Sequence, residues 1–435
     1  MSADVTIGGG RLAAHPLRAA VLGEVHARPF TPIETPRRVL HFAFETTPER
    51  GEADRAALTA FCQSRGLAGP QASDKQLRIE FGATALRWEQ HSEFTTYTWE
   101  LSSDGAAGVP FHPPAAGLAG PMGLVAQPGP VLVAVDLHLV RDGGNPALER
   151  LFDRASLAAA ENSDATALYA TDFQSDPDGF VRILIVDRGL GPERAGALTQ
   201  RVLELETYRV LALLGLPEAQ RLAPSVRRIE MRLTEVAAQT RGAQGLDANR
   251  RLLEELTALA AELEAGAAES QFRFGASRAY DQIVHLRLQT IGERKFDGLP
   301  TWTSFLARRM APAIRTIATL QERQAGLAEK LARAANLLRT RVDVELESQN
   351  RDVLRSMNER TRLQLMLQAT VEGLSVAAIS YYVIGLFSYL VKGAHDAGLV
   401  RIDPALATGA FVPLAVVLVW WIVRRIRTRH IRGAG

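Results

Sequence analysis

The sequence predicts an α/β domain with a mixed sheet, then long helices that include a coiled-coil stalk, then a C-terminal hairpin of two transmembrane helices. Three observations lead to this prediction. Short β-rich runs separated by glycine and proline fill the first part of the chain. No proline occurs between Pro312 and Pro404, so a very long helix can form there. Two charge-free apolar runs follow. The predicted parts are an α/β cytoplasmic domain over 1–190, a helical bundle over 191–300, a long stalk helix over 301–372, the hairpin over 373–423 and a basic cytoplasmic tail over 424–435.

Within the first part, β-rich runs alternate with turns, and one amphipathic helix is expected over 52–65. Runs rich in valine, isoleucine, threonine and aromatic residues, bounded by glycine and proline, are typical of strands. The expected strands cover 39–45, 76–81, 85–89, 94–101, 131–140, 166–173 and 180–186. A long loop is expected over 105–130, where glycine and proline are frequent.

From Pro192 onward the pattern becomes helical. The expected helices cover 195–214, 217–241, 248–268 and 270–293, with apolar residues on one face and dense arginine and glutamate on the other. Farther along, alternating spacings of three and four residues form the seam of a coiled coil. The seam residues are Ile317, Leu320, Gln324, Leu327, Leu331, Ala334 and Leu338. Earlier helices of the same chain could cover this seam, and so could other copies of the chain.

The two apolar runs, 373–391 and 405–423, each contain 19 residues without a formal charge. At a rise of 1.5 Å per residue, each helix would cover roughly 28 Å, about the thickness of the hydrocarbon core of a bilayer. The second run ends in two tryptophans followed at once by Arg424, a pattern typical of a membrane interface. The short connection 392–404 then requires an antiparallel hairpin. A buried helical hairpin in a soluble protein is the alternative.

The distribution of basic residues predicts how the hairpin is oriented. Arginines are frequent on both outer flanks, whereas the connecting loop holds only Lys392 and Arg401. Because basic residues favour the cytoplasmic side, both termini are expected in the cytoplasm. No signal peptide is predicted at the N-terminus, and a single cysteine, Cys62, excludes an intrachain disulfide. The formal net charge of +2 gives no reason to expect a nucleic-acid partner.

Motifs of known enzyme chemistry are absent from the sequence. Neither a P-loop nor an H-E-x-x-H helix occurs, so no catalytic residue and no cofactor is predicted, and the protein is not expected to be an enzyme. Glu24, His26 and Arg28 form the one cluster suited to acid–base or anion chemistry. This cluster either forms a ligand site or pins an N-terminal helix against the sheet. Asp136 and His138 share one face of a strand and are either two metal ligands or members of an ion pair.

A row of polar side chains runs into the first apolar run. Spacings of three and four residues place eight side chains on one side of the helix: Gln364, Gln368, Glu372, Ser375, Ile379, Tyr382, Leu386 and Tyr389. Polar groups at membrane depth are costly unless they face a partner or water. If several copies assemble with this face inward, Glu372 forms an anionic ring at the mouth of a cation pore. Alternatively, Glu372 pairs with an arginine such as Arg424, and the other polar groups hold helices together.

Four segments resemble an uncharacterised family of bacterial membrane-anchored proteins. They cover 15–18, 24–29 (EVHARP), 206–217 and 372–382, and the resemblance extends over essentially the whole chain. It implies a multi-pass protein of the bacterial inner membrane and brings no assigned activity.

The order of parts resembles that of the CorA-type magnesium channels. The resemblance implies a homo-oligomer, such as a pentamer, whose first span lines a cation pathway. The Gly-Met-Asn motif of those channels is absent: residues 381–391 occupy its place, and Gly385 with the nearby tyrosines are the analogues. In the outer loop, cation attraction would come from His395, Asp396 and Asp403. The sequence therefore favours a homo-oligomeric cation channel, and the alternative is a membrane-anchored scaffold or sensor whose cytoplasmic domain binds a partner or ligand.

Overall fold

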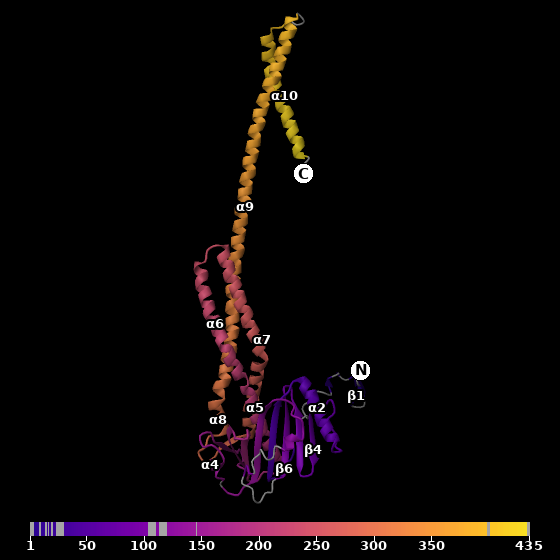
Figure 1. Cartoon of the computed structure of the whole chain (residues 1–435), viewed down its shortest axis with the longest axis vertical. Helices are drawn as coiled ribbons and strands as arrows, with labels where there is room; N and C mark the ends of the chain where they lie inside the picture. The colour runs from indigo at the N-terminus through magenta and orange to yellow at the C-terminus, as the bar shows by residue number, and fades with distance from the viewer. Residues whose placement is uncertain are drawn as a thin grey trace. The chain divides into compact units, whose positions relative to one another are not determined.

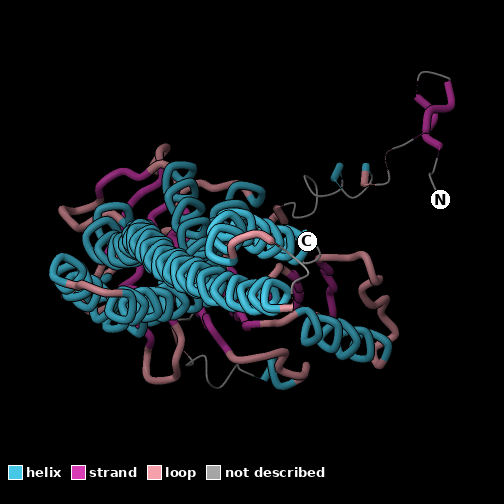
Figure 2. The backbone as a smooth tube through the Cα atoms, turned by 90° about the horizontal axis from the view of Figure 1, so that it is seen from above, coloured by secondary structure: helices cyan, strands magenta, loops and turns pink. Residues whose placement is uncertain are grey.

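The computed structural model describes residues 4–7, 10–13, 15, 17–18, 21–22, 30–102, 110–112, 120–144, 146–397 and 401–432. The chain divides into two compact units. The first unit comprises Met1–Ala238 and Glu255–Ala334, and the second comprises Gln239–Glu254 and Ala335–Gly435. Figure 2 shows the strands gathered mainly in one sheet, with helices forming most of the rest of the described chain.

A nine-stranded mixed sheet, counted over the described residues, forms the centre of the first unit. Its strands are β3 (Arg37–Glu45), β4 (Gln76–Phe81), β5 (Thr84–Gln90), β6 (Phe94–Ser102), β7 (Val131–Arg141), β8 (Ala158–Asn162), β9 (Ala167–Ser175), β10 (Val181–Asp187) and β11 (Glu293–Lys295). The spatial order is β11-β8-β9-β10-β7-β3-β6-β5-β4. Among the strands that the structure describes, only β7 and β10 pair in parallel. The predicted mixed sheet is confirmed, and β1 (Asp4–Ile7) and β2 (Gly10–Ala13) form a separate antiparallel pair.

Alternation along β7 divides its side chains between the two faces of the sheet. Val135, Leu137 and their apolar neighbours pack under helix α5 (Pro192–Leu213), which lies against the sheet in Figure 1. The same core includes residues of α7 (Leu246–Ile291) and α8 (Trp302–Arg309). Trp302 is fully buried there, and its indole N–H donates to the carbonyl oxygen of Ala158 over 3.2 Å. Residues from four distant parts of the sequence therefore share one core.

Helix α2 (Pro48–Gln63) packs on the opposite face of the sheet, against residues of β3, β4, β5 and β6. This helix begins at Thr47, whose hydroxyl accepts the backbone N–H of Arg50, as an N-cap does. Buried Asp54 accepts hydrogen bonds from the indole of Trp88 over 2.8 Å and from the hydroxyl of Tyr97 over 2.7 Å. These bonds satisfy the polar edges of two large buried rings. Two short helices, α3 (Gly120–Gly123) and α4 (Leu148–Leu151), lie in loops.

Helices α6 (Gly215–Gly242), α7 and α9 (Ala311–Asp396) run alongside one another in the first unit (Figure 1). The predicted seam residues from Ile317 to Leu331 are buried there, and Ala334 is half-buried. Arg323 of α9 pairs with Glu230 of α6 at 2.6 Å. Earlier helices of the same chain therefore cover this part of the seam.

Two expected helix boundaries were wrong. The break expected at 268–270 is absent, because α7 is unbroken over its 46 residues and the hydroxyl of Ser270 bonds to the carbonyl of Gly266 within the helix. The long helix begins at Ala311 rather than near 301, because the shorter helix α8 precedes it. Thr301 is the N-cap of α8, and its hydroxyl accepts the backbone N–H of Ser304.

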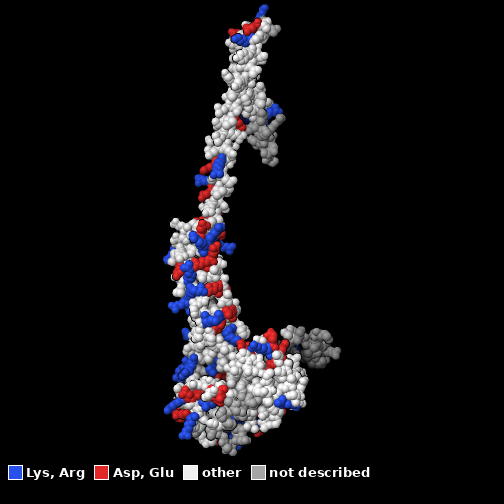
Figure 3. All heavy atoms as spheres, viewed as in Figure 1, with Lys and Arg blue, Asp and Glu red and all other residues white. Residues whose placement is uncertain are grey.

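In the second unit, α9 continues to Asp396 and is followed by α10 (Pro404–Arg432). Both helices are long and apolar enough to cross a membrane, and only 6% and 11% of their most apolar windows are buried within the structure. Figure 3 shows almost no charged atoms along this pair between its charged ends. Nearer the start of this unit, Arg341 of α9 donates to the carbonyl oxygen of Thr240 over 2.7 Å.

Candidate functional site

The eight residues from Gln364 to Tyr389 predicted to line a pathway are called the polar face here. Helix α10 packs against a different side of α9, where Ser380 is only 4% exposed and the rings of Phe387 and Phe411 stack with centroids 3.8 Å apart. Tyr382 and Tyr389 of the polar face are 69% and 81% exposed. Within one chain, helix α10 therefore leaves these two tyrosines of the polar face uncovered.

Five of the other six members of the polar face are exposed in the same way, and Glu372 is the exception. Gln364, Gln368 and Ser375 are exposed, and the hydroxyl of Ser375 donates to the backbone carbonyl of Val371 in the same helix. Glu372 is half-buried. Ile379 and Leu386 are exposed as well. The structure thus brings all eight side chains to one side of α9, and their lining of a pathway stays a prediction.

The three loop residues expected to attract cations lie at the turn of the hairpin. His395 and Asp396 are exposed at the end of α9. Asp403 precedes α10, and its carboxylate accepts the backbone N–H of Ala405 over 2.8 Å. Asp403 therefore has a local structural role as a helix cap, whatever its effect on cations.

Glu24, His26 and Arg28 lie outside the residues that the structure describes, so their role stays a prediction. Asp136 and His138 are described, and they belong to a buried polar cluster on the sheet.

Arg38 contacts the carboxylate of Asp136 through two hydrogen bonds of 2.9 and 2.7 Å. Burial raises the pKa of Asp136, and the bonds from Arg38 act in the opposite direction. His138 lies 3.5 Å from Asp136 and accepts the backbone N–H of Phe111 at its Nε2 atom. Burial lowers the pKa of His138 to about 3, so the ring is neutral near pH 7. Asp136 is thus a member of an ion pair, and no group of three or more metal-ligating side chains occurs among the described residues.

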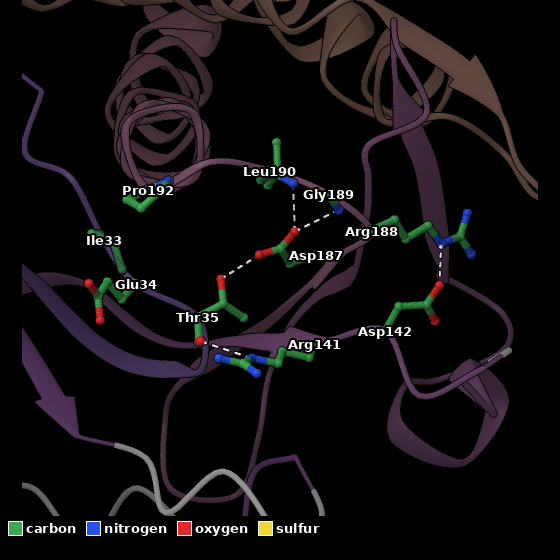
Figure 4. Close-up of a pocket in the computed structure, with 10 residues that line it drawn as sticks. All are labelled: Ile33, Glu34, Thr35, Arg141, Asp142, Asp187, Arg188, Gly189, Leu190 and Pro192. Atoms are coloured by element: carbon green, nitrogen blue, oxygen red, sulfur yellow. Dashed lines mark hydrogen bonds and ion pairs between the residues drawn. The ribbon is translucent and has the colours of Figure 1, made fainter.

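A hollow of about 670 Å³ lies at the carboxyl ends of the parallel strands β7 and β10 (Figure 4). Open α/β sheets often bind ligands at such ends. Here, however, Asp187 accepts hydrogen bonds from the hydroxyl of Thr35 over 2.6 Å and from the backbone N–H groups of Gly189 and Leu190. The Nε atom of Arg141 donates to the carbonyl oxygen of Thr35 over 3.1 Å. These bonds fix the loops around the hollow.

Two of the remaining charged groups of this hollow, Asp142 and Arg188, also have partners. Asp142 lies 3.5 Å from Arg188, and Arg188 contacts Glu161 at 2.6 Å. Glu34 is exposed at the rim. The carboxylates of Asp142 and Asp187 thus stabilise local structure, and the hollow does not have the arrangement of a metal centre.

Taken together, these features define an α/β protein extended by long helices, the last two of which are apolar enough to cross a membrane. The chain belongs to the family described as "Protein of unknown function (DUF3422)", whose family model matches residues 13–430. The predicted membership of an uncharacterised family is confirmed. The chain matches no curated protein and no solved structure.

Proposed function

We propose that the protein is a homo-oligomeric, CorA-like integral membrane protein whose first span lines a cation pathway. The observation that carries this proposal is the exposure of most of the polar face of α9, because α10 packs on another side of that helix. Polar side chains directed at lipid are costly, so the face needs either water or equivalent faces of neighbouring copies. A ring of copies around a hydrated pathway supplies both. In this proposal the protein lies in the bacterial inner membrane, with both termini in the cytoplasm.

The segment of α9 just before the span supports self-association. Every residue from 347 to 371 is exposed in the single chain. The large apolar residues among them are Val353, Leu354, Met357, Leu363, Leu365, Met366, Leu367 and Val371. A lone helix gains most of its stability from tertiary packing, and this segment has none within its own chain. Equivalent segments of neighbouring copies, packed as a coiled coil, would bury these side chains.

The chemistry of the polar face favours cations over anions. Glu372 is its one ionisable carboxylate near the membrane boundary, and rings of carboxylates select for cations in channels. The tyrosine hydroxyls and glutamine amides can replace part of the water around an ion. The order of parts, which resembles that of CorA-type channels, gives the same expectation, although the Gly-Met-Asn motif is absent.

Flux measurements on the full chain in liposomes test the proposal. We expect entry of Mg²⁺, Co²⁺, Na⁺ or K⁺ above that of empty liposomes, and a fall of several-fold in Glu372→Gln. Glu359→Gln is the matched control, because Glu359 is an exposed carboxylate on the opposite side of the same helix. Absence of flux for every cation, with the protein inserted and folded, would overturn the channel proposal.

A cysteine-modification experiment locates the pathway more closely. Cys62 is the only cysteine, so Cys62→Ser provides a background without thiols. In that background, we expect a charged thiosulfonate reagent to block flux through Tyr382→Cys. The same reagent should have little effect on Tyr381→Cys, because Tyr381 is exposed on a different side of the helix. Equal effects on both variants would contradict pathway lining by the polar face.

A further inference from the structure

A second hollow, of about 490 Å³, opens in the first unit beside helices α2, α5 and α7. We call it the aromatic pocket. It is defined by four rings, His91, Phe94, Tyr208 and Tyr280, and by two basic side chains, Arg55 and Lys75. Its volume falls within the range of sites for small molecules, about 300–1,000 Å³.

The four rings form one continuous wall. His91 stacks on Phe94 with centroids 4.1 Å apart, and Tyr208 stacks on Tyr280 with centroids 5.5 Å apart. Phe94 meets both tyrosines edge-on, at 6.1 and 6.4 Å. Phe94 is almost fully buried, whereas the other three rings are half-buried and therefore present surface to the hollow. A planar aromatic ligand can stack on such a surface.

The wall is held in place by neighbouring groups, so the site is largely formed before a ligand arrives. Tyr280 bonds to the carboxylate of Glu93, and burial together with this bond raises the pKa of Tyr280. The other partner of Glu93 is Arg273, at 2.6 Å. Arg273 offsets the negative charge of Glu93, so this carboxylate is a weak obstacle to an anionic ligand.

Two basic side chains, Arg55 and Lys75, also line the pocket. Arg55 lies over the ring of Trp88 at 5.2 Å and donates to the backbone carbonyls of Gln71 and Asp74 and to the side-chain oxygen of Gln90. These acceptors are neutral, so they hold the guanidinium in place without cancelling its charge. Lys75 is exposed. Asp54, which precedes Arg55 on α2, is directed into the core, where its carboxylate accepts hydrogen bonds from Trp88 and Tyr97.

From this arrangement, we propose that the aromatic pocket binds a mononucleotide. The base stacks on the ring wall, and the phosphate approaches Lys75 and Arg55. The proposal does not depend on a transport function, because binding is measured without flux. A site of this kind also meets the requirement of the alternative function, a membrane-anchored sensor.

Equilibrium dialysis and calorimetry of the full chain in detergent, with AMP, GMP, CMP and UMP as probes, test the proposal. We expect saturable binding of at least one nucleotide. Its nucleoside and inorganic phosphate, each tested alone, should bind at least about tenfold more weakly, because each uses only half of the site.

Variants separate the two halves of the site. Lys75→Gln should weaken nucleotide binding about 5–10-fold and leave the nucleoside unaffected, whereas Tyr208→Leu should weaken both ligands. Lys295→Gln, at an exposed lysine in β11, is the matched control and should bind as the parent does. Since Lys75 is exposed, its variant folds even if Tyr208→Leu does not. Absence of saturable binding by all four nucleotides at millimolar concentration, or unchanged affinity in Lys75→Gln, would overturn the proposal.

Discussion

Buried His41 should make the stability of the first unit depend on pH. Its Nδ1 atom lies 2.8 Å from the hydroxyl of Thr98, and its Nε2 atom lies 3.0 Å from that of Thr207. Thr207 donates its own proton to the carbonyl of Leu203, so it accepts from Nε2–H, and Nδ1 then accepts from Thr98. Both nitrogens are thus satisfied in the neutral ring. Burial, aided by the charge of Arg87, lowers the pKa of His41 from 6.5 to about 3.

The size and sign of the effect follow from these values. Between pH 6.5 and pH 3 the unfolded chain binds a proton at His41 that the folded chain does not, so stability falls as pH falls through this window. At pH 5 the loss is about 2 kcal/mol relative to pH 8, since each pH unit contributes about 1.4 kcal/mol. The entropy of unfolding of the first unit is roughly 0.7 kcal/mol per kelvin at about 2.1 cal/mol/K per residue, so the corresponding fall in the melting temperature is about 3 °C.

The assay compares thermal unfolding of the parent and of His41→Gln at pH 8 and pH 5 by near-ultraviolet circular dichroism. The variant should lose about 3 °C less than the parent on acidification, whatever its melting temperature at pH 8. Buried His138 adds a similar loss of stability on acidification, but this loss is the same in the parent and in the variant. His112→Gln, at an exposed histidine of the same unit, should behave as the parent does. An equal loss in parent and His41→Gln would refute the reasoning.

Three further predictions concern stability, each measured by thermal unfolding of the full chain. Arg38→Leu should cost about 3–5 kcal/mol of stability because it leaves the Asp136 carboxylate charged and buried without its partner. The double variant Arg38→Met with Asp136→Leu should recover most of this loss, because it removes both charges. A double variant as unstable as Arg38→Leu would contradict this explanation. Trp302→Ala should cost about 3–5 kcal/mol through the cavity it leaves in the core, so a loss below about 1 kcal/mol is incompatible with full burial. Gly196→Ala should cost about 1–3 kcal/mol because a Cβ there would meet a backbone oxygen at 1.9 Å, whereas Gly143→Ala, with no atom within 4 Å, should have little effect.

Local sequence patterns were enough to predict most strands, because period-two runs bounded by glycine and proline specify both element and face. Strand β8 was missed for a physical reason. Its residues, Ala158–Asn162, include three alanines, which favour helices in isolation. They form a strand because they pair with β9 and β11 inside a buried sheet, and small side chains fit under Trp302. Tertiary context thus overrides local propensity here.

For the candidate sites too, some features follow from local sequence patterns and others depend on tertiary contacts. Spacing along a single helix was sufficient to predict that the polar face is aligned. The side of α9 that α10 covers is determined by contacts between the two helices, such as that between Phe387 and Phe411. The spacing of residues along α9 alone does not specify that side. The aromatic pocket could not be predicted at all, because Arg55, Tyr208 and Tyr280 are far apart in the sequence and meet only in the folded unit.

The five tryptophans fall into two groups with different surroundings. Trp88, Trp99 and Trp302 are completely buried in the first unit, whereas Trp420 and Trp421 are about half exposed near the end of the second candidate span. If α10 crosses a membrane as proposed, their fluorescence has one component from a protein interior and one from the boundary of a bilayer. Lipids with brominated chains should quench only the second component, so the native protein already contains a spectroscopic probe of how deeply α10 inserts.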